Sequence, residues 1–271
     1  MLKGFSTTTF REVHQFLDGI APFRFQEDYD NAGLIVGDYE TEVKGVLVSL
    51  DCTEAVIDEA IDRGCNLVVC HHPIVFRGMK RFNGTSYVER TVMKAIRYDI
   101  GILAIHTNLD SVYQNGVNEK IASKLGLTEG TILAPKAAEH LGFPVGAGWI
   151  GSLPNPLSPT DFFGYLKECM GLQTFKYTAI CKEKISRVAL CGGSGFFLTK
   201  SALAAGADVY ITSDIKYHEF FDAEDRIILI DIGHFESERF TIDVLYDLIS
   251  NKFTNFAVQY TQVCTNPVKY Y

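Results

Sequence analysis

The chain has 271 residues, 47% of them hydrophobic and 21% charged, which predicts a globular α/β protein with a substantial core. Its net charge of -8 argues against a general nucleic-acid surface, because such binding requires clustered Lys and Arg. The first residues, "MLKGFSTTTF", lack the apolar region of a secretory signal. No run reaches the roughly 18 apolar residues of a membrane span. We therefore expect a soluble, cytoplasmic protein without membrane contact.

The seven cysteines are scattered without a C-x-x-C spacing. Several lie in or beside apolar runs that are typical of strands, among them Cys65, Cys70, Cys181 and Cys191. This pattern predicts reduced cysteines that pack as small apolar residues, and it favours neither a disulfide framework nor a zinc ribbon.

The first half of the chain alternates predicted helices and strands. Thr9 stands three residues before Glu12, the spacing of a capping box, so a helix is expected to run to about Asp18. The next predicted elements are a strand (43–51), a helix (53–64), a strand (66–70), a helix (87–99) and a strand (101–107). Strands that alternate with helices in this way predict parallel pairing.

The region from about 127 to 159 is rich in glycine and proline and is predicted to be a linker or lobe boundary. A helix (159–170) and the strand "FKYTAIC" follow. The segment "ISRVALCGGSGFFLTKSALAAGADVYITSD" then runs strand, helix, glycine, strand, as "VKGVLVSLDCTEAVIDEAIDRGCNLVVCHH" does. Either the two halves are related β-α-β units, or two crossover units simply look alike at this level.

Most of the histidines follow predicted strands, and ligand sites of parallel sheets lie beyond the carboxyl ends of the strands. The residues at such positions are His71 and His72, His106 and Asp110, Asp214, Lys216 and His218, and His234 and Glu238. Imidazoles and carboxylates are common ligands of transition metals, and a carboxylate can bridge two ions. A helix that starts near Glu236 or slightly earlier would place His234 and Glu238 on one face. The recurrence of these residue types favours a dinuclear metal site.

Three other features have competing interpretations. The loop "CGGSG" (191–195) could bind a phosphate at a helix N-terminus or could simply be a tight turn. Cys70 could be a nucleophile, although a core position fits its apolar surroundings better. The aromatic side chains near these loops could be platforms for base stacking, but packing in the core is the expectation; they are Phe196, Phe197, Phe220 and Phe221.

The stretches "DNAGLIVG", "HHPIVF", "HTNLD", "GADVYITSD" and "GHFESE" together resemble the GTP cyclohydrolase 1 type 2 homolog family, also called Nif-three-like or dinuclear metal centre hexameric proteins. The resemblance covers nearly the whole chain and matches the short form without an inserted middle domain. It implies an α/β fold of two related β-α-β lobes with mostly parallel sheets, expected at 1–128 and 129–271. Tyr29 stands where the family often has tryptophan, at a position expected to be packed.

The resemblance also implies two divalent metal ions, such as zinc, iron or manganese, at the junction of the lobes. His71 and Asp110 would bind one ion, His72 and His234 the other, and Glu238 would bridge them. His106, which matches the histidine of the family's "HTNLD" stretch, would either support the metal ligands from behind or transfer protons, and Asp214 could share the second role. The family further implies a toroidal homohexamer.

Two functions remain open at this stage. The first is a metal-dependent hydrolase. Its substrate would be a nucleotide, with GTP cyclohydrolase as the activity that the family name implies, or another small molecule such as a phosphoester or amide. The second is a non-enzymatic, ring-shaped scaffold or a metal-binding regulatory protein. A site of this kind does not by itself name its substrate.

Overall fold

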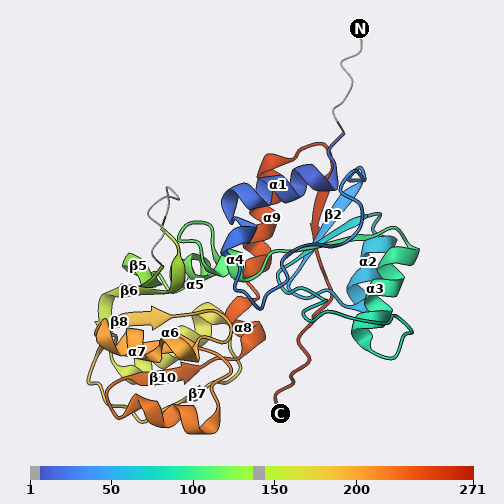
Figure 1. Ribbon diagram of the computed structural model, residues 1–271. Coiled ribbons are helices and arrows are strands. Elements are labelled where there is room, and N and C mark those ends of the chain that lie inside the picture. The colour runs from blue at the N-terminus through green and yellow to red at the C-terminus, as the bar shows by residue number, and fades with distance from the viewer. Residues whose placement is uncertain (1–6, 137–143) are drawn as a thin grey trace. The chain divides into compact units, whose positions relative to one another are not determined.

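The computed structural model describes residues 7–136 and 144–271, which form two compact units (Figure 1). Unit 1 comprises residues 1–109 and 241–267, and unit 2 comprises residues 110–240 and 268–271. This division differs from the expected lobes at 1–128 and 129–271. The C-terminal helix and strand belong to unit 1 because that strand pairs with the first strand of the predicted parallel set.

Unit 1 is built on a mixed five-stranded sheet in the order β1-β4-β3-β2-β11. Its helices and strands are α1 (Phe10–Ile20), η1 (Phe23–Phe25), β1 (Gly33–Val36), β2 (Gly45–Ser49), α2 (Glu54–Asp62), β3 (Leu67–Cys70), α3 (Tyr87–Arg97), β4 (Gly101–Ala104), α4 (Thr107–Asp110), whose last residue belongs to unit 2, α9 (Thr241–Lys252) and β11 (Ala257–Tyr260). All pairs are parallel except β1 with β4. The expected parallel core, with each strand joined to the next by a helix, is confirmed.

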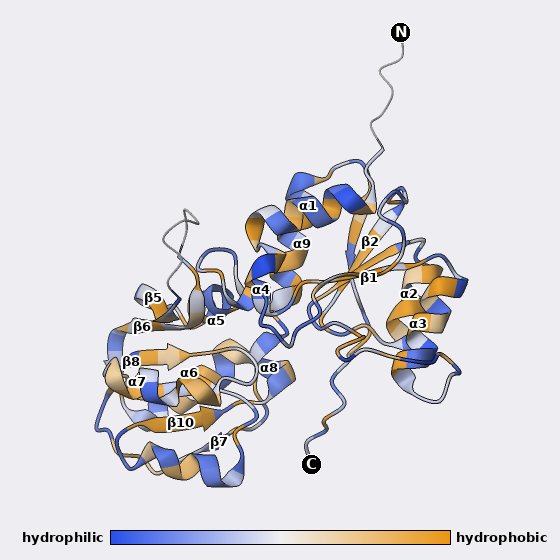
Figure 2. Cartoon of the chain, in the orientation of Figure 1, coloured by the Kyte–Doolittle hydropathy of each residue, from blue (hydrophilic) through white to orange (hydrophobic). Residues whose placement is uncertain are grey.

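The local sequence explains these elements well. Thr9 caps α1, and Glu12 completes the predicted capping box. Strands β2, β3 and β4 are buried along their whole length, which is why their sequences are apolar runs without alternation. Helices α2 and α3 lie side by side and pack an apolar stripe on this sheet, as the mixed colouring of these helices in Figure 2 shows.

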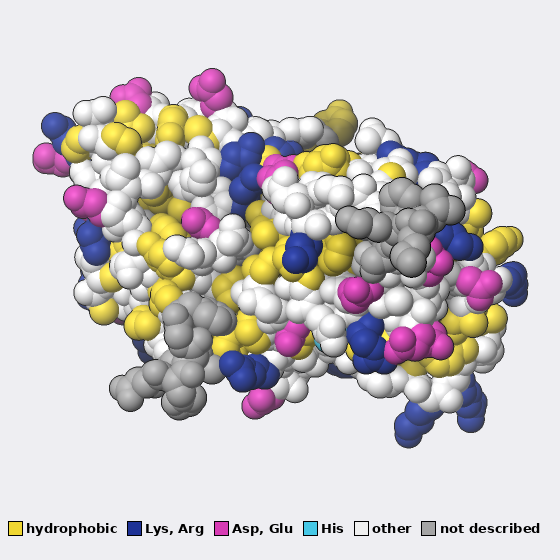
Figure 3. All heavy atoms as spheres, turned by 90° about the horizontal axis from the view of Figure 1, so that it is seen from above, with side chains coloured by type: hydrophobic (Ala, Val, Ile, Leu, Met, Phe, Trp, Pro, Cys, Tyr) yellow, Lys and Arg dark blue, Asp and Glu magenta, His cyan; other side chains and the backbone are white. Residues whose placement is uncertain are grey.

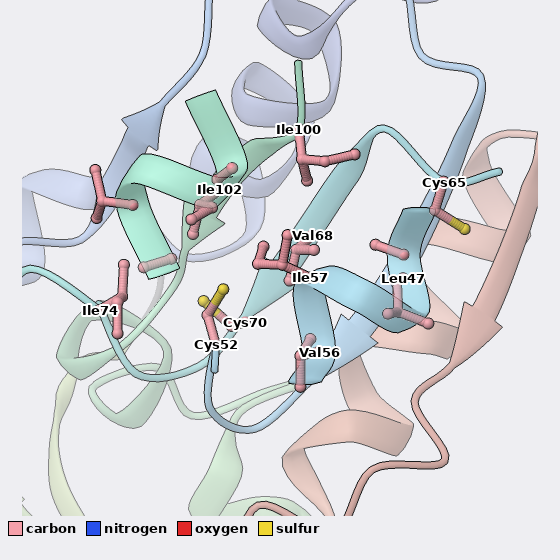
Figure 4. Packing of buried hydrophobic residues seen from close by; sticks show 14 residues of the cluster. Leu47, Cys52, Val56, Ile57, Cys65, Val68, Cys70, Ile74, Ile100 and Ile102 are labelled. Atoms are coloured by element: carbon pink, nitrogen blue, oxygen red, sulfur yellow. The ribbon is translucent and has the colours of Figure 1, made fainter. Parts of the chain in front are cut away.

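The core between this sheet and the helices α2 and α3 includes two neighbouring cysteines, Cys52 and Cys70 (Figure 4). Both are reduced and buried, as the sequence predicted. Burial raises the pKa of Cys52 to about 12 and that of Cys70 well above its usual value. A thiol with so high a pKa is not ionised near neutral pH, so Cys70 is a core residue and the nucleophile interpretation is wrong.

Unit 2 has a six-stranded sheet in the order β5-β6-β8-β9-β10-β7 within the described residues. Its elements are α5 (Val117–Lys124), β5 (Thr128–Pro135), β6 (Gly146–Leu157), α6 (Pro159–Met170), β7 (Lys176–Tyr177), β8 (Ile185–Leu190), η2 (Phe196–Leu198), α7 (Thr199–Ala204), β9 (Val209–Thr212), η3 (Tyr217–Ala223), β10 (Ile228–Asp231) and α8 (His234–Glu238). The strands β8, β9 and β10 are parallel neighbours, like β2, β3 and β4 of unit 1. The other three pairs are antiparallel, so this sheet is mixed rather than mostly parallel.

The predicted linker at 127–159 is wrong where the structure describes it, because β5 and β6 pair there as antiparallel strands. Its glycines mark crowded positions rather than a flexible chain. A Cβ at Gly130 would lie 2.3 Å from the ring of Trp149, and one at Gly146 would lie 2.4 Å from the carbonyl oxygen of Ala134. Glycine is therefore required by close packing within these strands. Residues 137–143 of this stretch lie outside the described residues.

No helix of the described residues is long and apolar enough to cross a bilayer.

Gly101, at the start of β4, provides a test of the unit 1 core. A Cβ at this position would lie 2.3 Å from the ring of Phe10, which is only 1% exposed. We expect Gly101→Ala to destabilise the protein by about 1–3 kcal/mol, because the buried ring must shift. Thermal unfolding of the two proteins measures the difference.

Gly19→Ala in α1 is the matched control, since a Cβ there meets nothing within 4 Å. Alanine has the higher helix propensity, so this variant should be as stable as the parent protein or up to about 1 kcal/mol more stable. Equal stability of Gly101→Ala and the parent would contradict the packing described for Phe10.

Candidate metal-binding residues

Three histidines meet at the carboxyl ends of β3 and β4 in unit 1. His71 and His72 directly follow β3, and His106 lies two residues after β4. The ring centroids of these three side chains are 4.9–5.3 Å apart. Each offers a ring nitrogen within 4.8 Å of the other two, which is close enough for a shared metal ion. The strand-end rule therefore placed these three residues correctly.

The Nδ1 atom of each of these imidazoles is already engaged. The partners are the carbonyl oxygen of Ile105 for His71 (2.8 Å), Asp51 Oδ1 for His72 (2.8 Å) and Asp30 Oδ1 for His106 (2.8 Å). A carbonyl or a carboxylate only accepts, so Nδ1 must carry the proton in each ring. In the neutral imidazole the lone pair is then on Nε2, which is the arrangement found in histidines that bind metal ions.

The two carboxylates behind these histidines are themselves held in place. Asp30 also accepts hydrogen bonds from the amide and the hydroxyl of Thr107. Burial alone would raise the pKa of Asp30, but the hydrogen bonds from His106 and Thr107 outweigh it and lower the pKa to about 2. Asp51 accepts a hydrogen bond of 2.5 Å from Thr265, and its pKa is likewise lowered despite its burial, chiefly by His72. Both groups therefore remain charged acceptors for their histidines.

Unit 2 carries a second set of candidate ligands on α8. His234 begins this helix and Glu238 ends it, one turn apart on the same face as predicted. His234 Nδ1 lies 2.7 Å from Asp214 Oδ2, and His234 Nε2 lies 3.0 Å from Glu238 Oε2. A lone pair on Nε2 would repel that carboxylate. A proton or a metal cation must therefore lie between the two atoms, and Glu238 is only 3% exposed.

Asp110 lies near the same carboxylate. The candidate ligand oxygens of Asp110 and Glu238 are within 4.8 Å of each other. Burial raises the pKa of the nearby Cys191 thiol, and the negative charges of Asp110 and Glu238 raise it further. The thiol therefore stays neutral, while a cation shared by the two carboxylates would offset their mutual repulsion.

The glycine loop between β8 and η2 packs against Glu238 instead of forming an open anion site. Three of its amides donate to protein oxygens: Gly192 to Asn118 Oδ1, Gly193 to Ser237 Oγ and Gly195 to Thr212 Oγ1. With three amides engaged in this way, the loop is a tight turn beside the candidate ligand Glu238, and the phosphate interpretation is not supported.

Some predicted site residues lie apart from these clusters. His218 contacts the rings of Tyr217 and Phe221 on η3 and, within the described chain, is in none of the groups that could hold a metal ion. Lys216 is exposed and faces Glu219. Of the four aromatics expected in the core, Phe196 and Phe220 pack there, but Phe197 and Phe221 are 69% and 65% exposed.

Sequence reasoning missed the supporting carboxylates Asp30 and Asp51. Asp51 follows β2 closely, so the strand-end rule that identified the histidines could also have identified this residue. Asp30 comes from the loop before β1, and only its place in the stretch "DNAGLIVG" drew attention to it.

A family model described as Duf34/NIF3 (NGG1p interacting factor 3) matches residues 8–267. The chain belongs to the Duf34/NIF3 family. A protein of Clostridium acetobutylicum called GTP cyclohydrolase 1 type 2 homolog is 34% identical over 231 residues, 84% of each chain. A protein of Campylobacter jejuni with the same name is 31% identical and covers 96% of this chain and 98% of its own.

Two solved structures have the same fold as this chain. A hypothetical protein of Staphylococcus aureus, SA1388, matches with a TM-score of 0.90 at 30% identity, over 98% of this chain and 100% of its own. A NIF3-related protein of Bacillus cereus matches with a TM-score of 0.89 at 23% identity over 98% of this chain and 100% of its own, which supports the fold alone. The alignment to one Staphylococcus aureus relative spans 364 residues, against 271 in this chain. That relative therefore has an insertion, and this NIF3 protein is a short form, as predicted.

Gly193 offers a test of the packing around Glu238. Its φ is +63°, and a Cβ there would lie 2.2 Å from Glu238 Oε1. We expect Gly193→Ala to displace this carboxylate and to lower the metal content of the purified protein, as measured by elemental analysis.

The control is Gly206→Ala, which has a similar φ of +72° but open space around the new Cβ. Both variants carry the cost of alanine in a left-handed conformation, about 1 kcal/mol. Only Gly193→Ala should lose metal. An equal metal content in both variants would show that the position of Glu238 does not matter for metal binding.

Proposed function

We propose that this NIF3 protein is a metal-dependent hydrolase and that His71, His72, Asp110, His234 and Glu238 bind two divalent ions. All five stand at the end of a strand or a helix: His71 and His72 directly follow β3, Asp110 ends α4, and His234 and Glu238 begin and end α8. The set contains nitrogen and carboxylate donors but no ionised thiol, which suits zinc, iron or manganese.

One observation carries this proposal. In four imidazoles the Nδ1–H group donates a hydrogen bond to an oxygen acceptor, which places the lone pair for a metal ion on Nε2. The four residues are His71, His72, His106 and His234. An isolated structural histidine commonly has one such bond. Four of them, in a chain that also offers the buried carboxylate of Glu238 and the partly buried one of Asp110, are typical of ligands fixed for metal binding.

The surrounding residues have roles that follow from their contacts. A pair of divalent ions would supply a nucleophile from water near neutral pH and polarise the bond under attack. His106 is suited to proton transfer, because the hydrogen bond to Asp30 holds the orientation of its ring. Asp214, proposed from the sequence for proton transfer, is placed to orient His234, and both roles are compatible with its exposed carboxylate.

The names of the relatives suggest a substrate. Relatives bear the name GTP cyclohydrolase 1 type 2 homolog, so GTP is the first compound to test. The family description also names an interacting factor, which favours a second candidate, a metal-binding scaffold or regulatory protein. For both candidates we propose a toroidal homohexamer, whose mass can be measured by native mass spectrometry.

The first test of the proposed function combines metal analysis with a GTP assay. We expect about two ions per chain in the parent protein. Glu238→Gln keeps the size of the side chain but removes the charge, so it should lose metal and any GTP turnover together. Elemental analysis and chromatography of the reaction products measure these two quantities.

The three possible results separate the candidates. Metal loss together with loss of turnover supports the hydrolase. Metal loss in the variant, with no turnover of GTP by the parent protein, would support the proposed metal site. It would also favour another substrate or the scaffold over a GTP hydrolase. A parent protein that binds no metal after reconstitution would refute both the metal site and the hydrolase.

Asp51→Asn tests whether the carboxylate behind His72 supports metal binding. Asparagine can still accept a hydrogen bond from Nδ1 but lacks the negative charge, so metal affinity should fall roughly 10- to 100-fold. Competition with a chelator of known affinity measures the change. Asp58→Asn is the control, because Asp58 is an exposed carboxylate paired with Lys94 on the outer helices, and its metal affinity should match that of the parent.

A further inference from the structure

Two exposed aromatic rings adjoin the histidine cluster of unit 1. The ring of Phe76 lies 6.1 Å from that of His106, and the ring of Tyr29 lies 6.1 Å from that of Phe76. Tyr29 is 64% exposed and Phe76 is 42% exposed. The expectation that Tyr29 is a packing residue is therefore wrong. Large aromatic side chains held in solvent beside candidate catalytic groups are typical of a surface that binds a ligand.

Hydrogen bonds fix the two loops that present these rings. Asn31 Nδ2 donates to the carbonyl oxygen of Val75, 2.7 Å away, and so ties the Tyr29 loop to the residue before Phe76. Asp30, next to Tyr29, accepts from His106 and from Thr107. The position of both rings relative to His106 is thus set by neighbouring residues. A pre-formed surface loses less entropy when it binds a ligand.

The segment that follows Phe76 is basic. Arg77, Lys80 and Arg81 are all exposed, and no ion pair or hydrogen bond to them is found in the described residues. This local group of positive charges contrasts with the net charge of -8 of the whole chain. Three cations that are not neutralised by neighbouring carboxylates create a local attraction for phosphate groups.

Both ends of this basic segment are anchored. At the start, Ile74 is buried in the unit 1 core (Figure 4). At the end, the Glu89 carboxylate accepts hydrogen bonds from the amides of Asn83 and Thr85 and from the hydroxyls of Thr85 and Ser86. The cations therefore lie on a short loop with fixed ends, close in sequence to His71 and His72.

We propose that Tyr29, Phe76 and the basic loop 77–81 bind a free nucleotide, with its planar base against the aromatic rings and its phosphates at Arg77, Lys80 and Arg81. This inference deepens the proposed function, because the same site would then act on a phosphorylated heteroaromatic compound. Aromatic rings stack on any base, and the guanidinium groups of arginine match phosphate oxygens.

A free nucleotide fits better than a nucleic-acid strand. The cations occupy one short loop, whereas strand binding uses a longer basic groove. The face drawn in Figure 3 carries acidic and basic side chains interspersed, without an extended basic area. The net negative charge of the chain also disfavours binding of a nucleic-acid strand.

The test is calorimetric binding of GTP, guanosine and inorganic triphosphate to the full-length, metal-loaded protein. Tyr29→Ala should weaken binding of GTP and guanosine roughly 10-fold, but should leave binding of triphosphate unchanged. Tyr29→Phe should restore binding, because the ring is retained. The triple variant Arg77→Ala, Lys80→Ala, Arg81→Ala should weaken binding of GTP and triphosphate but not of guanosine.

Tyr98→Ala and Arg97→Ala are matched controls. Both residues are exposed and lie just before β4, at the opposite end of that strand from His106, so neither change should alter binding. Metal content should equal that of the parent in all variants. This readout separates the proposal from the metal site: nucleotide binding that depends on Tyr29 without any turnover would uphold the ligand surface and count against the hydrolase.

Three results would overturn the proposal. The first is GTP binding that Tyr29→Ala leaves unchanged, whether or not GTP is hydrolysed. The second is tighter binding of a single-stranded oligonucleotide than of GTP, which would assign the surface to nucleic acid. The third is a change in oligomeric mass for Tyr29→Ala with unaltered GTP binding, which would make these rings a contact between copies of the chain.

Discussion

The hydrogen bond between an imidazole Nδ1 and an oxygen acceptor is the interaction on which the candidate site depends. It occurs at His71, His72, His106 and His234, with acceptors from Ile105, Asp51, Asp30 and Asp214. Each bond fixes both the orientation of the ring and the nitrogen that carries the lone pair. Without it, a histidine at the end of a strand could rotate or change its tautomer, and a metal ion would have to pay the cost of ordering the ring.

These acceptors are available because parallel strands end together. The strands β2, β3 and β4 are adjacent and parallel, so the residues after them are brought to one edge of the sheet. Asp51 follows β2 and meets His72 after β3, while the backbone of Ile105 after β4 meets His71. In unit 2, Asp214 and His234 follow the adjacent strands β9 and β10. The same topology thus supplies a histidine and its acceptor in both units.

The sequence predicted those parts of the molecule that depend on local pattern. The buried strands were readable because they are uninterrupted apolar runs, and α1 because Thr9 and Glu12 form a capping box. The candidate ligands were found because their residue types recur after strands. The strands β5 and β6 were missed, since the glycines that permit tight contacts with Trp149 and Ala134 have the same composition as a linker. The pairing of β11 with β2 joins residues more than 200 positions apart, and no local pattern records it.

The exposure of Tyr29 was not predicted, because the sequence does not show which side chains of an ordered loop face the solvent. Tyr29 was expected to pack because it stands where the family often has tryptophan. The side chains of Asp30 and Asn31 have hydrogen-bond partners in the protein. Their hydrogen bonds fix the loop in a position that exposes Tyr29 to solvent. The ring of Tyr29 lies next to Phe76, whose ring in turn lies next to His106. Exposing an aromatic ring forgoes on the order of 1–2 kcal/mol of burial. A chain that fixes its loop so firmly while leaving that ring exposed is better explained by a ligand for the ring than by packing.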